Sequence, residues 1–225
     1  MHPGSDPTRR IPDPTRRFET PPGLLGDRYR LDDLLGSGGM ADVYRAEDLR
    51  LQRPVAVKIF RSGADPDGER RFFAEARLLA NLRHPGLVAV YDFAVEDRRA
   101  YLVMELVDGA TLAHELEREP YTAAAATQVG LELARVLAYL HDEGVVHRNV
   151  TPSNVLIDRD GHIRLADFGI SRLVAGPAAA DPTFGADLTP EQRRGEPAGP
   201  PADIYALGMV LLEAITGQGS AEVPR

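Results

Sequence analysis

The chain has 225 residues, 43% of them hydrophobic and 27% charged, a composition typical of globular proteins. It contains no cysteine, which excludes disulfides, thiolate zinc sites and cysteine nucleophiles. The formal net charge of −8 argues against a nucleic-acid-binding role, and the lack of a signal region or an apolar run of roughly 18 to 20 residues predicts a cytoplasmic protein without a membrane span.

Residues 1–27 are rich in proline and arginine, and the fragment Asp-Pro-Thr-Arg-Arg occurs twice, at 6–10 and 13–17. Such a segment has too little apolar surface to offset the entropy lost on ordering. We therefore predict a disordered tail, with a specific docking peptide as the alternative. Thr8 and Thr15, each followed by two arginines, are candidate phosphoacceptors.

A β-hairpin is predicted from Tyr29 onward, because partly alternating apolar runs flank a cluster of glycines. The residues of the turn are Gly36, Ser37, Gly38 and Gly39. Glycines let a backbone approach a phosphate without interference from a Cβ atom, and Val43 would cover a planar base. A simple turn without a ligand is the alternative.

The next predicted strand, 55–60, is apolar except for Lys58. A buried lysine needs an anionic partner or costs several kcal/mol, whereas a lysine on an edge strand can face solvent. Residues 69–82 have the spacing of an amphipathic helix that carries Glu75, a candidate partner for Lys58. A Glu75 exposed on the helix surface is the alternative.

Further elements follow in a regular order. They are expected strands at 87–93 and 100–106, a turn at 107–112, a helix at 123–141, a loop to Asn154, a hairpin of 155–158 and 162–165 closed by Asp160 and Gly161, and a helix from Asp203. The segment 171–188 is rich in Ala, Pro and Gly, which predicts a mobile segment.

These motifs, in this order, resemble the bacterial serine/threonine protein kinase family over residues 29–219. The stretch His147-Arg148-Asn149-Val150-Thr151-Pro152-Ser153-Asn154 is similar to the kinase catalytic loop, and Asp167-Phe168-Gly169 to its metal-binding triplet. The resemblance implies a two-lobed α+β fold. An N-lobe with an antiparallel sheet and one helix, with the hinge, is expected over 28–107, and a mainly helical, partial C-lobe over 108–225.

The resemblance also implies a site for ATP and Mg²⁺. The implied ATP-binding residues are Gly36, Ser37, Gly38, Gly39, Val43, Ala56, Lys58, Glu75, Met104, Glu105, Val107 and Leu156. The implied metal ligands are Asn154 and Asp167, and Glu75 would pair with Lys58 and order it toward the phosphates. Leu79, Val90, His147 and Phe168 would stack between the lobes.

Several positions depart from the family pattern. Asn149 stands where the family has the aspartate that accepts the substrate proton, and Thr151 replaces a lysine, while Arg148 is retained. The segment 183–187 lacks the residues that shape the peptide platform. The family's last helices have no counterpart before Arg225, so an exposed apolar patch at 209–212 and self-association are expected.

The sequence therefore predicts a pseudokinase-like domain that binds ATP and Mg²⁺ and transfers phosphate weakly or not at all. A weakly active serine/threonine kinase is the alternative, and a fragment that binds protein partners without nucleotide is the second alternative. A protein substrate or regulatory protein is the expected macromolecular partner.

Overall fold

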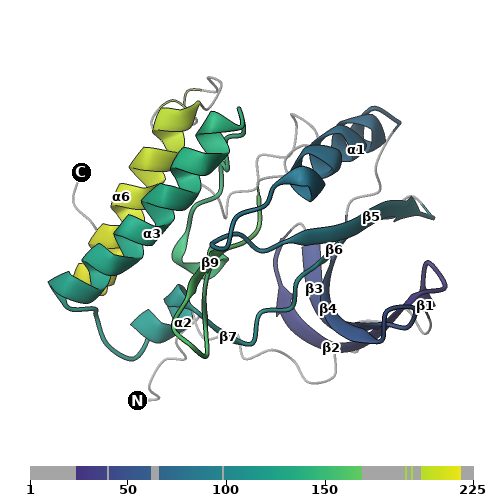
Figure 1. The fold of residues 1–225 in the computed structure, drawn as a ribbon, viewed down its shortest axis with the longest axis horizontal. Coiled ribbons are helices and arrows are strands. Elements are labelled where there is room, and N and C mark those ends of the chain that lie inside the picture. The colour runs from purple at the N-terminus through teal and green to yellow at the C-terminus, as the bar shows by residue number, and fades with distance from the viewer. Residues whose placement is uncertain are drawn as a thin grey trace, which may run out of the picture.

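The computed structural model describes residues 24–39, 41–61, 66–97, 99–168, 191, 194 and 199–218. Within these ranges the chain forms a curved sheet with one helix and a second, mainly helical part (Figure 1). The predictions made for residues 1–23 of the tail, for Gly169, and for the segments 171–188 and 183–187 lie outside the described residues. The disorder predicted up to residue 27 is wrong for its end, because Leu24 and Leu25 form a short strand that pairs with Arg30 and Tyr29.

The sheet of the first part contains strands that pair antiparallel in the order β1-β2-β3-β4-β6-β5. Their bounds are β1 Leu24–Leu25, β2 Tyr29–Ser37, β3 Ala41–Asp48, β4 Arg53–Phe60, β5 Val90–Glu96 and β6 Arg99–Met104. The helix α1, Pro66–Asn81, lies beside β5 (Figure 1). Phe72 of α1 packs edge-on against Phe60 and Phe93, with ring centroids 5.7 and 6.3 Å away, which fixes the helix on the sheet.

The second part is built on two long helices, α3 Ala123–Asp142 and α6 Pro200–Thr216, which lie side by side (Figure 1). Thr122 caps α3 by accepting a hydrogen bond from the backbone N–H of Ala125 at 3.2 Å. Gly130 lets the helices approach, because a Cβ there would lie 3.0 Å from Leu211. The shorter elements are β7 Gly109–Thr111, α2 Leu112–Leu116, the 3₁₀ turn η1 Pro152–Asn154, β8 Val155–Asp158 and β9 Ile163–Leu165.

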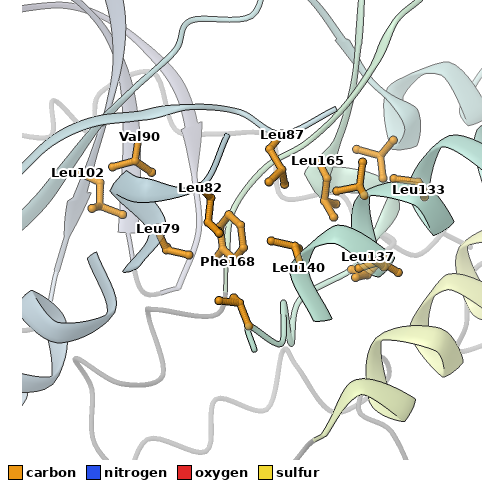
Figure 2. Close-up of a cluster of buried hydrophobic side chains, with 14 of the residues drawn as sticks. Leu79, Leu82, Leu87, Val90, Leu102, Leu133, Leu137, Leu140, Leu165 and Phe168 are labelled. Atoms are coloured by element: carbon orange, nitrogen blue, oxygen red, sulfur yellow. The ribbon is translucent and has the colours of Figure 1, made fainter. Parts of the chain in front are cut away.

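One buried cluster joins the two parts. Phe168 lies between Leu79 and Leu82 at the end of α1 and Leu140 at the end of α3 (Figure 2). The imidazole of His147 packs against the Phe168 ring with centroids 4.6 Å apart. The predicted stack of Leu79, Val90, His147 and Phe168 is confirmed to the extent that all four are buried and the two rings touch.

The predicted elements are confirmed, with shifts at their ends. The strand expected from 87 begins at Val90, while Leu87 forms only an isolated parallel bridge with Leu165. The strand expected to reach 106 ends at Met104, because the N–H of Glu105 leaves the sheet and donates to the carbonyl of Ala89 at 2.9 Å. The turn expected at 107–112 contains β7 and the start of α2.

The prediction of an exposed apolar patch at 209–212 of α6 is wrong for Val210, because this residue is only 1% exposed. Val210 faces inward because the helix turns through about 100° per residue and presents that position to the core. The exposed apolar side chains of α6 are instead Ile204, Tyr205 and Ile215, at 53%, 41% and 51%. No helix in the described ranges is long and apolar enough to cross a membrane.

Candidate nucleotide-binding site

Strand register places the glycine-rich turn next to Lys58. Gly36 of β2 pairs with Val43 of β3, and Val43 pairs with Lys58 of β4. One step across the sheet, Ala56 of β4 pairs with Met104 of β6. Directly opposed residues in antiparallel strands point to the same face, so Val43 and Lys58 share a face, as do Ala56 and Met104.

The glycines of the turn are not required by the packing of the chain itself. A Cβ added at Gly36 would meet nothing within 4 Å, and one at Gly38 would meet only the carbonyl of Ala41, at 3.7 Å. Neither residue has a positive φ. Open space at these positions suits a ligand that approaches the backbone closely.

Arg61, just after β4, holds the turn, and sequence reasoning missed it. Its guanidinium donates to the hydroxyl of Ser37 at 2.6 Å and to the carboxylate of Asp42 at 2.5 and 3.0 Å. This contact lowers the pKa of Asp42. The contact depends on the register of three strands, which no local sequence pattern gives. Ser37 pairs with Asp42 across the hairpin, and Asp42 pairs with Ile59, close to Arg61.

Lys58 is the only lysine in the chain and is 5% exposed. Its ammonium group contacts the carboxylate of Asp167, which follows β9. The predicted ion pair between Lys58 and Glu75 is wrong for this structure, since neither an ion pair nor a hydrogen bond joins them in the described part of the chain. Asp167 supplies the anionic partner that the buried ammonium group needs, while Glu75 remains half-buried on α1.

Asn149, Asn154 and Asp167 are connected by hydrogen bonds. The amide Nδ2 of Asn149 donates to the backbone carbonyl of Asp167 at 3.0 Å, and Nδ2 of Asn154 donates to the backbone carbonyl of Asn149 at 2.8 Å. The structure therefore brings Lys58, Asn149, Asn154 and Asp167 together. Within the described residues, the side-chain oxygens of Asn149 and Asn154 accept no hydrogen bond.

Asp203 at the start of α6 anchors the loop that carries Arg148 and Asn149. It is 1% exposed and accepts hydrogen bonds from the backbone N–H groups of His147 at 2.8 Å and Arg148 at 2.7 Å. The imidazole Nε2 of His141 lies 2.9 Å from the same carboxylate. Arg148 has a φ of 65°, an unfavourable conformation for a residue with a side chain, so these contacts hold a strained backbone.

Thr151 lies in the same loop and is half-buried. Its carbonyl accepts from the N–H of Asn154 at 3.0 Å, which forms the turn η1. A threonine side chain is shorter than a lysine and uncharged, so the loop lacks a cation at this position.

The segment 105–108 joins the two parts of the chain. The carboxylate of Glu105 accepts from Arg164 of β9 at 3.1 and 3.3 Å. No hydrogen bond among the described residues uses the carbonyl of Glu105 or the N–H of Val107, so both groups are free to bind the edge of a base. After this segment, Thr111 of β7 pairs with Leu156 of β8.

These groups suit a nucleotide with a divalent cation. Lys58 supplies a charge for phosphates, and Asp167 and the free oxygen of Asn154 are the oxygen ligands that Mg²⁺ prefers. The open glycine positions and the free backbone groups of the 105–108 segment suit the rest of a nucleotide. Bound Mg²⁺ would neutralise charge on the phosphates.

Fold and site together define a protein-kinase-like domain, and residues 29–222 match the protein kinase domain family. The serine/threonine-protein kinase PknB of Mycobacterium tuberculosis is 41% identical over 212 residues, which cover 88% of this chain and 34% of that protein. PrkC of Bacillus subtilis is 39% identical over 201 residues, covering 86% of this chain and 31% of that protein. The chain thus spans about a third of the length of these curated relatives.

Solved structures agree with this assignment. The M. tuberculosis PknI kinase domain has a TM-score of 0.73 and 27% identity, covering 88% of this chain and 79% of that one. Rad53 in complex with AMP-PNP has a TM-score of 0.73 and 26% identity, covering 86% of this chain and 49% of that one. The chain belongs to the protein kinase family, among the bacterial serine/threonine kinases of the eukaryotic-like type.

The buried His147 should make the stability of this domain depend on pH. Burial lowers the pKa of its imidazole from 6.5 to about 4, so the unfolded chain takes up a proton before the folded chain does. The free energy of unfolding should therefore be highest above pH 6.5 and fall by about 3 kcal/mol as the pH drops toward 4. Urea denaturation at a series of pH values measures this change.

The variant His147→Phe is the control for this prediction. It keeps an aromatic ring against Phe168 and removes the titrating group, so its stability should change less between pH 6.5 and 4. An equal pH dependence in the parent and in His147→Phe would contradict the prediction.

Proposed function

We propose that this domain binds ATP with Mg²⁺ and transfers phosphate to protein serine or threonine residues poorly or not at all. The observation that carries the proposal is the convergence of Lys58, Asp167 and Asn154 around a position where Asn149 replaces the proton acceptor. The similar fold of Rad53, solved in complex with AMP-PNP, supports nucleotide binding by this architecture. A cytoplasmic location stays a prediction from the sequence.

The expected rate follows from the chemistry of Asn149. An amide can orient a hydroxyl group through its oxygen but has no useful basicity near pH 7. A positioned general base contributes about 10²- to 10⁴-fold, and protein kinases turn over at about 1 to 100 per second. Without the base, this domain would transfer roughly 10⁻⁴ to 1 phosphate per second.

A weakly active kinase is the second candidate. The side-chain oxygen of Asn149 accepts no hydrogen bond from the described residues, so it is available to a substrate hydroxyl. Phosphoryl transfer depends mainly on positioning and charge, which Lys58 and a bound cation would supply. A turnover of the parent equal to that of a variant with both Asn149→Asp and Thr151→Lys would favour this candidate.

Nucleotide binding is tested by thermal unfolding with ATP, in the presence and absence of Mg²⁺. ATP with Mg²⁺ at 100 times its Kd should stabilise the parent by about 2.7 kcal/mol, which raises the melting temperature by roughly 5 to 10 °C. Lys58→Met should abolish most of this shift, because the phosphate contact is lost. Asp167→Asn should reduce only the part that requires Mg²⁺.

Two variants control the experiment. Arg99→Met removes a cation from an exposed position at the start of β6 and should leave the shift unchanged. Lys58→Arg keeps the charge but replaces a compact ammonium group by a planar guanidinium, and should also lose affinity. If the parent shows no shift with ATP, nucleotide binding is excluded and only a protein-binding role remains.

A further inference from the structure

Asn149 forms a contact that the aspartate typical of its position is unable to form. Its Nδ2 group donates to the backbone carbonyl of Asp167 at 3.0 Å. An ionised carboxylate has acceptors only, so an aspartate in this rotamer would place a negative oxygen against the oxygen of that carbonyl. The exchange of a carboxylate for an amide therefore adds a hydrogen bond at the same time as it removes a base.

This hydrogen bond is one of three made by the loop 149–154 and residues 166–167. Nδ2 of Asn154 donates to the carbonyl of Asn149 at 2.8 Å, and the N–H of Ala166 donates to the carbonyl of Asn154 at 2.8 Å. Two bonds, from Asn149 to Asp167 and from Ala166 to Asn154, thus join the loop 149–154 to residues 166–167, and the third lies within the loop. Two of these bonds use backbone acceptors and asparagine amides, and only the one from Asn149 reaches Asp167 itself.

Asp167 needs such support. Its φ is 65°, in the left-handed region, which is unfavourable for a residue with a side chain. Residues remain in such conformations only where the surrounding structure holds them. The carbonyl bound by Asn149 and the carboxylate bound by Lys58 belong to the same residue, so both ends of Asp167 are fixed.

We propose that Asn149 is a positioning residue, which holds the backbone of Asp167 by donating a hydrogen bond and so sets the direction of its carboxylate. The contact itself does not depend on nucleotide binding. Its consequence for a bound cation rests on the function proposed above. On this proposal the domain has exchanged a proton acceptor for a more rigid metal ligand.

The contact is tested first by thermal unfolding without any ligand. Asn149→Ala removes one hydrogen bond, so its melting temperature should be about 2 to 4 °C below that of the parent. The melting temperature of Asn149→Asp should be lower still, because its carboxylate faces a carbonyl oxygen. Asn81→Asp is the matched control, since Asn81 donates to the carbonyl of Arg77 at an exposed position, where water can replace the bond. An Asn149→Asp variant that melts at or above the parent temperature would overturn the proposal.

A second measurement separates positioning from general stability. The affinity for AMP-PNP is measured by calorimetry with and without Mg²⁺, at a temperature where parent and Asn149→Ala are both folded. The gain in affinity that Mg²⁺ produces should be about threefold to tenfold smaller in Asn149→Ala, while the affinity without Mg²⁺ stays the same. An equal gain in the two proteins would overturn the positioning role.

The two measurements distinguish an error in the proposed contact from an error in the proposed function. If the parent has no affinity for AMP-PNP, the function proposed above is wrong, but the melting temperatures still test the contact. If the parent binds and Asn149→Asp is not destabilised, the contact is wrong and nucleotide binding stands.

Discussion

Replacing Asn149 by Asp and Thr151 by Lys should raise phosphate transfer by about 10²- to 10⁴-fold. The carboxylate restores a group that can accept the proton of the substrate hydroxyl, and the lysine adds a charge in the half-buried loop where Thr151 lies. The measurement is the transfer of radiolabelled phosphate from ATP to a generic basic protein, with saturating Mg²⁺.

The single variants show how much of this gain in phosphate transfer each substitution supplies. Asn149→Asp should supply most of the gain, and Thr151→Lys alone should supply little, because charge without a base leaves proton transfer unassisted. Adding Lys58→Met to the double variant should abolish the gain, which shows that the activity arises at this site. Equal rates in the parent and the double variant would contradict a lost proton acceptor and favour an already active kinase.

Activity and stability should move in opposite directions in these variants. The same Asn149→Asp change that restores a base removes the hydrogen bond to Asp167. The double variant should therefore transfer phosphate faster while melting at a lower temperature without ligand. The assay must be run below that temperature for the rates to be compared.

Asp203→Ala should cause the largest loss of stability among the substitutions considered, about 3 to 5 kcal/mol. The carboxylate is 1% exposed and binds the N–H groups of His147 and Arg148 together with the imidazole of His141. Without it, two buried backbone donors lose their partner, and each such loss costs about 1 to 3 kcal/mol. Urea denaturation, compared at equal pH, gives the difference in the free energy of unfolding.

His141→Ala is the control for the Asp203 prediction. It removes only one of the partners of Asp203 and leaves both backbone contacts in place, so the loss should be about 1 kcal/mol. A loss for Asp203→Ala no greater than that for His141→Ala would show that the backbone contacts contribute little.

The fold was predictable because its signals are local. Alternating apolar residues identified strands such as 55–60, and helical spacing identified 69–82 and 123–141, with errors confined to a few residues at the ends. The end of β6 was misplaced because the bond between Glu105 and Ala89 joins positions whose approach depends on the whole sheet.

The site was predictable as a set of positions, but its contacts were not. The sequence motifs identified Lys58 and Asp167 as residues of the site, but they predicted Glu75 as the partner of Lys58. Which carboxylate reaches a buried ammonium group depends on the placement of α1 against the second part of the chain, and no short sequence pattern encodes that. The roles of Arg61 and of the Asn149 amide were missed because both depend on side-chain direction.

The scarcity of lysine gives this domain an unusual chemical property. Apart from an α-amino group, the side chain of Lys58 is the only primary amine in the sequence, and it is 5% exposed. Within this sequence, reagents that acylate or cross-link amines will therefore react at the α-amino group or at Lys58, in the proposed nucleotide site. Attachment to a surface through amines would risk blocking that site, whereas a mass shift on the peptide that contains Lys58 would report directly on whether it is accessible.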